Sequence, residues 1–265
     1  MQKKEEKMYS ALLVIIYLAF ISLGLPDTLL GSAWPQMHIE LNASLSSAGI
    51  ITMIISMGTV ISSLFSDRLN IKLGTGKVTA ISVLMTAVAL LGFSLSHSFI
   101  ILCVLAVPYG LGAGAVDAAL NNYVALHYSS KHMSWLHCFW GVGASIGPYI
   151  IGTCMAHGLG WRGGYSVISV LQFTLTAALF ITLPLWKKVE NSENNVSNGN
   201  NERTQEEPQE RKAKSLSEVL HIKGVIYILF AFFCYSAVEQ TTTLWCASYL
   251  VLNRSIDSNI AAKLP

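Results

Sequence analysis

The chain has 265 residues, of which 52% are hydrophobic and only 12% are charged, and its mean hydropathy is +0.51. Soluble domains carry about 25% charged residues, so this composition argues against a soluble protein and for a lipid environment. The formal net charge is only +2, and the basic residues are scattered between apolar blocks, which excludes a nucleic-acid-binding stripe. The five cysteines lack the close spacing of a zinc or redox pair, so neither a metal site nor a cofactor is expected.

Apolar blocks of about 20 residues or more recur along the chain, and each is long enough to cross a hydrocarbon core about 30 Å thick. We therefore predict an all-α fold, a multi-span membrane helix bundle with seven spans. The predicted spans cover residues 9–30, 46–65, 78–96, 99–126, 135–157, 165–186 and 225–252.

Lysine and arginine predict the orientation of these spans, because the cytoplasmic loops of membrane proteins are enriched in both. If the N-terminus lies inside, 14 of the 17 lysines and arginines fall on the cytoplasmic side and only Arg162, Arg254 and Lys263 fall outside. The prediction is a multi-pass protein of the cell membrane with a cytoplasmic N-terminus and with membrane lipid as its partner.

A polar segment separates the sixth predicted span from the seventh. Residues 191–210 are rich in Asn, Glu and Gln and lack the hydrophobicity to fold alone. We predict a six-helix domain over 1–187, a cytoplasmic polar linker over 188–221, and the first helix of an incomplete C-terminal domain over 222–265. Six spans, a basic linker and a further span match transporters built from two six-helix halves.

Three acidic side chains lie deep in apolar spans, namely Asp27, Asp117 and Glu239. A carboxylate at the bilayer centre costs about 2.5 to 3.5 kcal/mol on insertion scales, so each indicates a function or an internal partner. Burial disfavours the charged form of a carboxyl group, and a proton-coupled symporter needs this property. Asp27 and Asp117 are our candidates for proton coupling; the alternative for both is a polar anchor between helices.

Small residues accompany these acids. At about 3.6 residues per turn, Gly110, Gly114, Asp117 and Asn121 share one face of the fourth span, which predicts a close approach to another helix beside a polar group. In the fifth span, residues 143–148 contain two glycines at small-xxx-small spacing and a proline that should kink the helix.

Other polar and aromatic side chains on the spans could contact a solute. Carboxylates and amides accept and donate the hydrogen bonds that hold sugar hydroxyls, and tryptophan can stack on a sugar face. The competing interpretations are a hydrogen bond between helices for the histidine and an interfacial belt for the tryptophans. The candidate substrate-binding residues are Asn121, His137, Trp140, Glu239, Gln240 and Trp245.

Residues 66–69 read Ser-Asp-Arg-Leu, and residues 74–77 read Gly-Thr-Gly-Lys, between the second and third spans. This segment resembles the signature loop of the major facilitator superfamily, although Ser63 stands where the family usually has a glycine. In that family the loop is tied to the gate between the domains. The resemblance therefore implies gating roles for Asp67 and Arg68.

The glycine-rich fourth span with Asp117 and Asn121, the Gly-Pro element of the fifth span, His137, and the acidic seventh span with Glu239 resemble the fucose-permease-like branch of that superfamily. The resemblance implies two inverted three-helix repeats in the first six spans. It also implies alternating access around a site near the bilayer midplane, lined by spans one, four, five and seven. We expect cation-coupled uptake, with a proton as the coupling ion, of a sugar or similar polyol.

Two other hypotheses stay open. Within transport, the Gly-Pro run of the fifth span resembles an antiporter element and favours export of drug-like molecules or metabolites. Outside transport, the chain stops at Pro265, where family members continue into further helices, so a truncated, non-transporting membrane protein or an assembly subunit is the alternative. No phosphate-binding loop, nucleophile elbow or metal cluster is present in the sequence, and we do not expect an enzyme.

Overall fold

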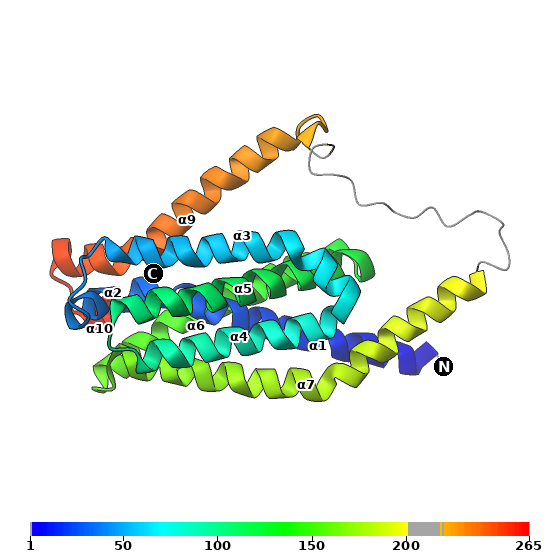
Figure 1. Cartoon of the computed structure of the whole chain (residues 1–265), viewed down its shortest axis with the longest axis horizontal. Coiled ribbons are helices and arrows are strands. Elements are labelled where there is room, and N and C mark those ends of the chain that lie inside the picture. Colours follow the sequence, from blue (N-terminus) through cyan, green and yellow to red (C-terminus); the bar gives the residue numbers. More distant parts are fainter. Residues whose placement is uncertain (1, 201–217, 219, 265) are drawn as a thin grey trace.

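A computed structural model of the chain describes residues 2–200, 218 and 220–264. Every regular element in these residues is a helix, and the helices form an elongated bundle (Figure 1). They are α1 (Gln2–Asp27), α2 (Leu29–Glu40), α3 (Ser47–Leu73), α4 (Thr75–Leu95), α5 (Phe99–His127), α6 (Ser130–Ala156), α7 (Gly160–Asn200), α9 (Val225–Arg254) and α10 (Ser258–Ala261).

Seven helical stretches of the described residues are long and apolar enough to cross a membrane, which confirms the predicted all-α multi-span bundle. The first span combines α1 and α2, which are separated only at Thr28. Several helices are longer than their predicted spans; the second, for example, continues from residue 65 to Leu73. The apolar block marks the thickness of the hydrocarbon core, whereas the helix continues beyond it on polar residues.

The predicted linker over 188–221 falls partly outside the described residues. α7 continues as a helix to Asn200, into the stretch predicted to lack a fold of its own. A helix that is already nucleated propagates easily into polar residues, and the apolar part of α7 supplies such a nucleus. Residues 201–217 and 219 lie outside the described part, and the predicted domain boundaries stay predictions.

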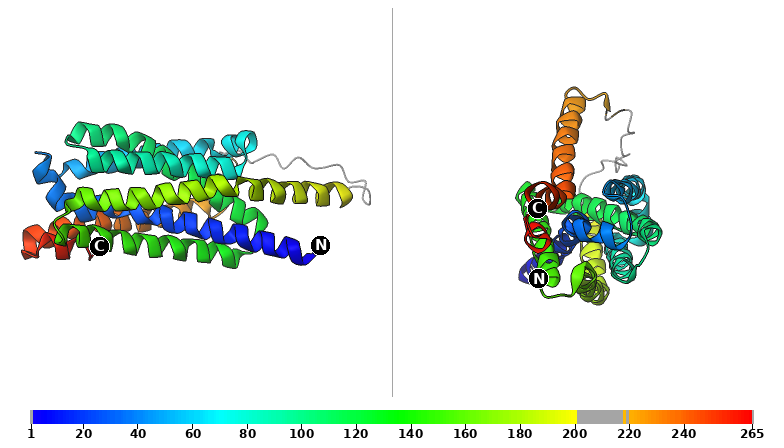
Figure 2. Two further views of the ribbon diagram at one scale, coloured as in Figure 1. Left: turned by 90° about the horizontal axis from the view of Figure 1, so that it is seen from below. Right: turned by 90° about the vertical axis from the view of Figure 1, so that its left-hand side faces the viewer.

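Alternate connections of the bundle lie at opposite ends (Figures 1 and 2). The start of α1 and the α3–α4 and α5–α6 connections share one end, whereas the α2–α3, α4–α5 and α6–α7 connections and α10 share the other. The basic residues Lys72, Lys77 and Lys131, which lie near the α3–α4 and α5–α6 connections, are therefore at the same end as the N-terminus.

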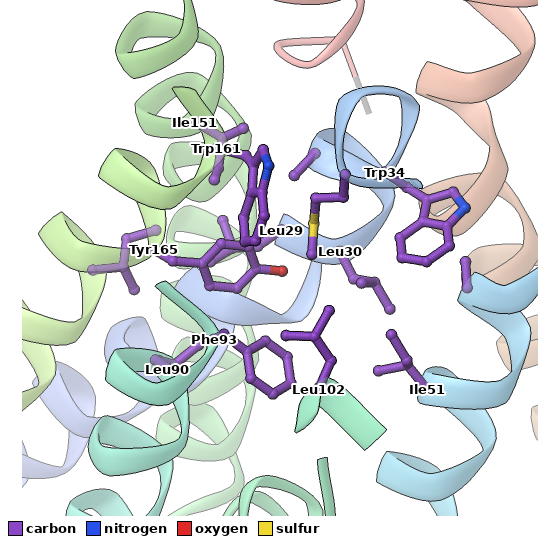
Figure 3. Close-up of a cluster of buried hydrophobic side chains, with 14 of the residues drawn as sticks. Leu29, Leu30, Trp34, Ile51, Leu90, Phe93, Leu102, Ile151, Trp161 and Tyr165 are labelled. Carbon is purple, nitrogen blue, oxygen red and sulfur yellow. The ribbon is translucent and has the colours of Figure 1, made fainter. Parts of the chain in front are cut away.

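Large aromatic side chains fill the core around α2 (Figure 3). Trp34 and Trp161 are completely buried, and Tyr165 is 1% exposed. The Trp34 indole donates a hydrogen bond to the Leu45 carbonyl oxygen at 2.7 Å, and Trp161 donates to Glu40 Oε2 at 3.0 Å. Each of the two buried indoles therefore has a partner for its N–H group, as burial requires.

Glycines bring helix backbones into direct contact. A Cβ atom at Gly110 of α5 would lie 2.3 Å from the Ile55 carbonyl oxygen of α3, and one at Gly143 of α6 would lie 2.1 Å from the Ile21 carbonyl oxygen of α1. Both helix pairs can approach this closely only without the side chain. The close approaches predicted for the fourth and fifth spans are confirmed.

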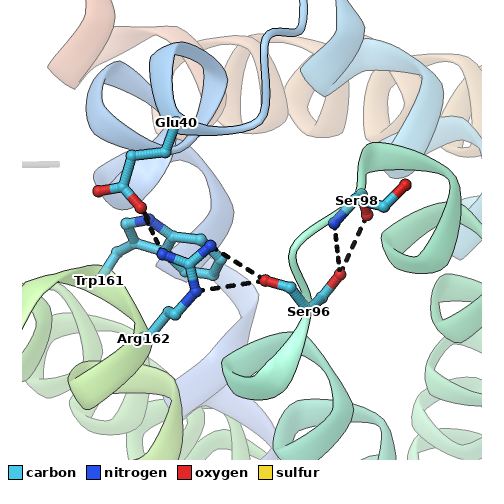
Figure 4. Close-up of polar contacts among 5 residues, drawn as sticks. All are labelled: Glu40, Ser96, Ser98, Trp161 and Arg162. Carbon is cyan, nitrogen blue, oxygen red and sulfur yellow. Dashed lines mark hydrogen bonds and ion pairs between the residues drawn. The ribbon is translucent and has the colours of Figure 1, made fainter.

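Arg162 ties three helices together at the α2 end of the bundle (Figure 4). Its guanidinium pairs with Glu40 of α2 and donates hydrogen bonds to the Ser96 carbonyl oxygen, just after α4, at 3.1 and 3.2 Å. The same group lies 4.2 Å from the ring centre of Trp161, at cation–π distance. One side chain thus connects α2, α4 and α7.

Arg162→Gln is expected to destabilise the protein by about 1 kcal/mol, because its partners lose charge-assisted hydrogen bonds. The arginine and Glu40 side chains are 30% and 36% exposed, so water replaces part of the lost interaction. Thermal unfolding in detergent measures the change. Arg254→Gln is the control, because that guanidinium contacts only the Tyr249 ring, at 5.7 Å from its centre, among the interactions described. If both variants lose the same thermal stability, the result would contradict the assignment of Arg162 as the connection between α2, α4 and α7.

Candidate functional site

A cavity of about 1010 Å³ lies among the spans, with side chains from both halves of the first span and from α3, α4, α5, α6, α7 and α9 on its walls. Its lining combines carboxylates, hydroxyls and aromatic rings. The polar and aromatic lining residues are Phe20, Asp27, Thr52, Ser56, Thr59, Ser63, Phe93, Tyr109, Asp117, His137, Trp140, Tyr165, Phe232, Tyr235, Ser236, Glu239, Gln240 and Thr243.

Asp27 is the last residue of α1, at the break in the first span, and its side chain reaches two ring donors on other helices. The Trp140 indole of α6 donates to Asp27 Oδ2 at 2.8 Å, and the Tyr109 hydroxyl of α5 donates to Oδ1 at 3.4 Å. Asp27 remains exposed to the cavity. The carboxyl group is therefore held by neighbouring helices and is accessible to a solute.

Asp117 lies on α5, on the same cavity wall as Gly114. Its Oδ1 accepts a hydrogen bond from Asn121 Nδ2, one turn further along the helix, at 2.9 Å. His137 of α6 lines the same cavity. An acid with its amide partner and an imidazole are thus available in one polar region.

α9 forms a separate edge of the site. It contacts α2 at Gly31, where a Cβ atom would lie 2.0 Å from the Thr243 carbonyl oxygen, and it diverges from the bundle toward Val225 (Figures 1 and 2). Glu239 and Gln240 line the cavity from this helix, and the Tyr235 hydroxyl donates to Glu239 Oε1 at 3.3 Å. A third carboxyl group therefore faces the same space.

The sequence profile of the Major Facilitator Superfamily matches residues 16–261, which include all seven spans almost completely. The chain belongs to this superfamily. Members of this superfamily are membrane transporters and not enzymes, in line with the prediction that the chain is not an enzyme.

Similar curated proteins match only in part. An uncharacterized transporter, y4wD, of Sinorhizobium fredii (strain NBRC 101917 / NGR234) is 25% identical over 116 residues, which are 43% of this chain and 31% of that protein. Synaptic vesicle glycoprotein 2B of Rattus norvegicus is 24% identical over 181 residues, 66% of this chain and 26% of the relative. For synaptic vesicle glycoprotein 2C of the same species, the values are 24% over 168 residues, 62% and 23%. The matches thus cover about a third or less of each relative.

The structure places six of the predicted site residues of this superfamily member around one cavity: Asp27, Asp117, His137, Trp140, Glu239 and Gln240. Asn121 does not line the cavity but binds Asp117, which does. Trp245 is partly buried and packs against the hydrophobic core that contains Trp34 and Trp161. The predicted gating residues Asp67 and Arg68 are exposed near the end of α3, away from the cavity lining. All of these roles stay predictions.

The prediction did not include the α3 wall of the cavity. Thr52, Ser56, Thr59 and Ser63 line it at spacings of four, three and four residues, which is one face of a helix. The helical spacing of these four hydroxyl residues was the signal in the sequence that could have predicted this wall of the cavity. Tyr109 was missed as well, because nothing in its own span indicates that Asp27 lies opposite.

The part of the chain that the structure describes contains no cluster of three or more His, Cys, Asp or Glu side chains that could hold a metal ion. Its five cysteines are free thiols. The described site residues are hydrogen-bonding, ionisable and aromatic side chains.

Proposed function

We propose that the protein is a secondary active transporter that takes up a sugar or a related small polar solute together with a proton, by alternating access. The observation that carries the proposal is the convergence of Asp27, Asp117 and Glu239 on one cavity of about 1010 Å³ within membrane spans. Carboxyl groups are costly at this depth and mark substrate or proton pathways in membrane proteins. The cavity volume is at the upper end of the usual range for small-molecule sites.

Proton uptake and solute binding would be linked at Asp27. As a carboxylate it accepts hydrogen bonds from Trp140 and Tyr109, and a charged acceptor makes such bonds about twice as strong as a neutral one. Protonation weakens both bonds and so frees ring donors for a solute. Asp117, with His137 and Asn121 nearby, is the second proton site in this proposal, and Glu239 and Gln240 hold solute hydroxyls from α9.

The membrane arrangement is also part of the proposal. The basic residues near the α3–α4 and α5–α6 connections lie at the same end as the N-terminus, which supports a cytoplasmic N-terminus in the cell membrane. We assign the six-helix unit to residues 1–187 and a second unit to 222–265, with Asp67 and Arg68 at the gate. The acidic α5 and α9 support membership of the fucose-permease-like branch.

Uptake of labelled sugars into vesicles after a pH jump tests the proposal. The wild type should accumulate a sugar when the outside is acidic, and Asp117→Asn should lose this accumulation because its amide cannot exchange a proton. Asp257→Asn makes the same change at a carboxylate that caps α10 outside the cavity, and asparagine caps equally well. Full accumulation by Asp117→Asn would overturn proton coupling through that residue.

Export of drug-like molecules is the second candidate, and the aromatic walls of the cavity favour it. Phe93, Tyr109, Tyr165 and Phe232 present ring faces or edges beside three carboxyl groups, which suits an apolar cation. Acid-driven efflux of a fluorescent cationic dye, without sugar uptake, would support export. If the purified, folded chain shows no uptake and no efflux, the result would support the non-transporting alternative.

A further inference from the structure

Two prolines interrupt the helices that hold Asp27: one lies in α1, which carries Asp27, and the other lies in the neighbouring α6. Pro26 precedes Asp27 in α1, and Pro148 lies in α6, which also carries Trp140. Proline has no N–H group, so the carbonyl four residues earlier loses its helical hydrogen bond. The two carbonyls that lose their partners are those of Ser22 and Ala144. In a membrane span such groups need a donor from elsewhere in the protein.

Gln172 of α7 supplies the donor for the first carbonyl. Its Nε2 donates to the Ser22 carbonyl oxygen at 2.6 Å, and the Ser22 hydroxyl donates in return to Gln172 Oε1. Gln172 is 2% exposed and Ser22 is 6% exposed, so water cannot take over either role. Both the nitrogen and the oxygen of this amide therefore bind Ser22, at the point where Pro26 interrupts the hydrogen-bond ladder of α1.

Thr28 supplies the donor for the second carbonyl. Its hydroxyl donates to the Ala144 carbonyl oxygen of α6 at 3.0 Å, and Thr28 is the residue that separates α1 from α2. Ala144 lies one helical turn beyond Trp140, which donates to Asp27. Two consecutive residues of the first span, Asp27 and Thr28, thus contact α6 one turn apart.

We propose that Gln172 and Thr28 are positioning residues for Asp27. Each replaces the hydrogen bond that a proline removes, and together they attach the break in the first span to α7 and to α6. The break then cannot rotate freely, and the Asp27 carboxyl group stays within reach of Trp140 and Tyr109. The link to proton coupling rests on the proposed function, whereas the pairing of each side chain with a proline-freed carbonyl does not.

A double-mutant cycle on the purified full chain in detergent tests this pairing. Gln172→Leu should lower the thermal midpoint in the wild-type background. Pro26→Ala restores an N–H group for the Ser22 carbonyl, so in that background the same change should lower the midpoint by about half as much or less. An equal drop in both backgrounds would overturn the assignment of Gln172.

A second cycle pairs Thr28→Val with Pro148→Ala and decides the question if Gln172→Leu does not fold, because valine keeps the shape of threonine. In each cycle the crosswise pair is the control, Gln172→Leu with Pro148→Ala in the first and Thr28→Val with Pro26→Ala in the second, and it should be additive, since that proline frees a different carbonyl. Non-additivity of the same size in the crosswise pair would mean a general loosening of the bundle and would contradict the proposal.

The positioning role itself is tested by the pH dependence of sugar uptake. Gln172→Leu should shift the pH of half-maximal uptake, and Pro26→Ala should return it toward the wild-type value. If the thermal midpoints show that Gln172→Leu and Pro26→Ala are not additive, but the pH profile of uptake is unchanged, the hydrogen bonds exist without a positioning role. That result would overturn the positioning role. Absence of uptake in the wild type would count against the proposed function, while the midpoint cycles would still decide the pairing.

Discussion

Asp27→Asn is expected to abolish proton-driven accumulation of the solute while the protein stays folded. A gradient of one pH unit supplies about 1.4 kcal/mol per proton, which sustains about a tenfold accumulation of a neutral solute. Asparagine cannot take up and release this proton, so the ratio of inside to outside concentration should fall to about 1. Its side-chain oxygen still accepts the hydrogen bond from Trp140, and its NH2 group can donate to the Tyr109 hydroxyl oxygen in place of the bond that Asp27 accepts, so both helix contacts persist.

Exchange experiments separate coupling from binding in this variant. Labelled solute should still enter vesicles preloaded with unlabelled solute at equal pH, because exchange needs binding and alternating access but no net proton movement. Loss of both exchange and accumulation, with an unchanged thermal midpoint, would assign Asp27 to solute binding instead of proton coupling. Wild-type accumulation in Asp27→Asn would contradict any essential role for this residue.

The spans and their apolar or glycine-bearing faces could be predicted from the sequence, because both depend on local patterns. The length of an apolar block sets where a helix crosses the hydrocarbon, and helical periodicity places Asp117 beside Gly114 without knowledge of the neighbouring helix. The first span shows the limit of this reasoning. It was predicted to end near residue 30, yet α2 continues to Glu40 because its polar end packs onto Trp161 and Arg162.

The partners across helices could not be predicted, because a pattern within one helix does not identify the helix that faces it. Trp140 and Trp245 were equivalent candidates in the sequence, but only Trp140 lines the cavity and binds Asp27. Gln172 stands among apolar residues of α7 without any local sign that it faces Ser22. Contacts of this kind depend on the tilt and rotation of packed helices.

Gly143→Ala is expected to destabilise the protein by about 1 to 3 kcal/mol and to impair transport, because it forces apart the two helices that hold Asp27. The new Cβ atom would lie 2.1 Å from the Ile21 carbonyl oxygen and 2.9 Å from the Leu25 backbone nitrogen. Both contacts are with the backbone of α1, which cannot move aside as a side chain can. Separation of α1 from α6 would also lengthen the bond between Trp140 and Asp27.

Gly141→Ala provides a matched control on the same helix, two residues away. No heavy atom lies within 4 Å of the Cβ position there, and alanine is about 1 kcal/mol more favourable than glycine within a helix. The control should therefore be as stable as the wild type or more stable. If both alanines destabilise the protein equally, α6 needs glycine for its own flexibility. If only Gly143→Ala does so, direct backbone contact with α1 is what holds the Asp27 site together.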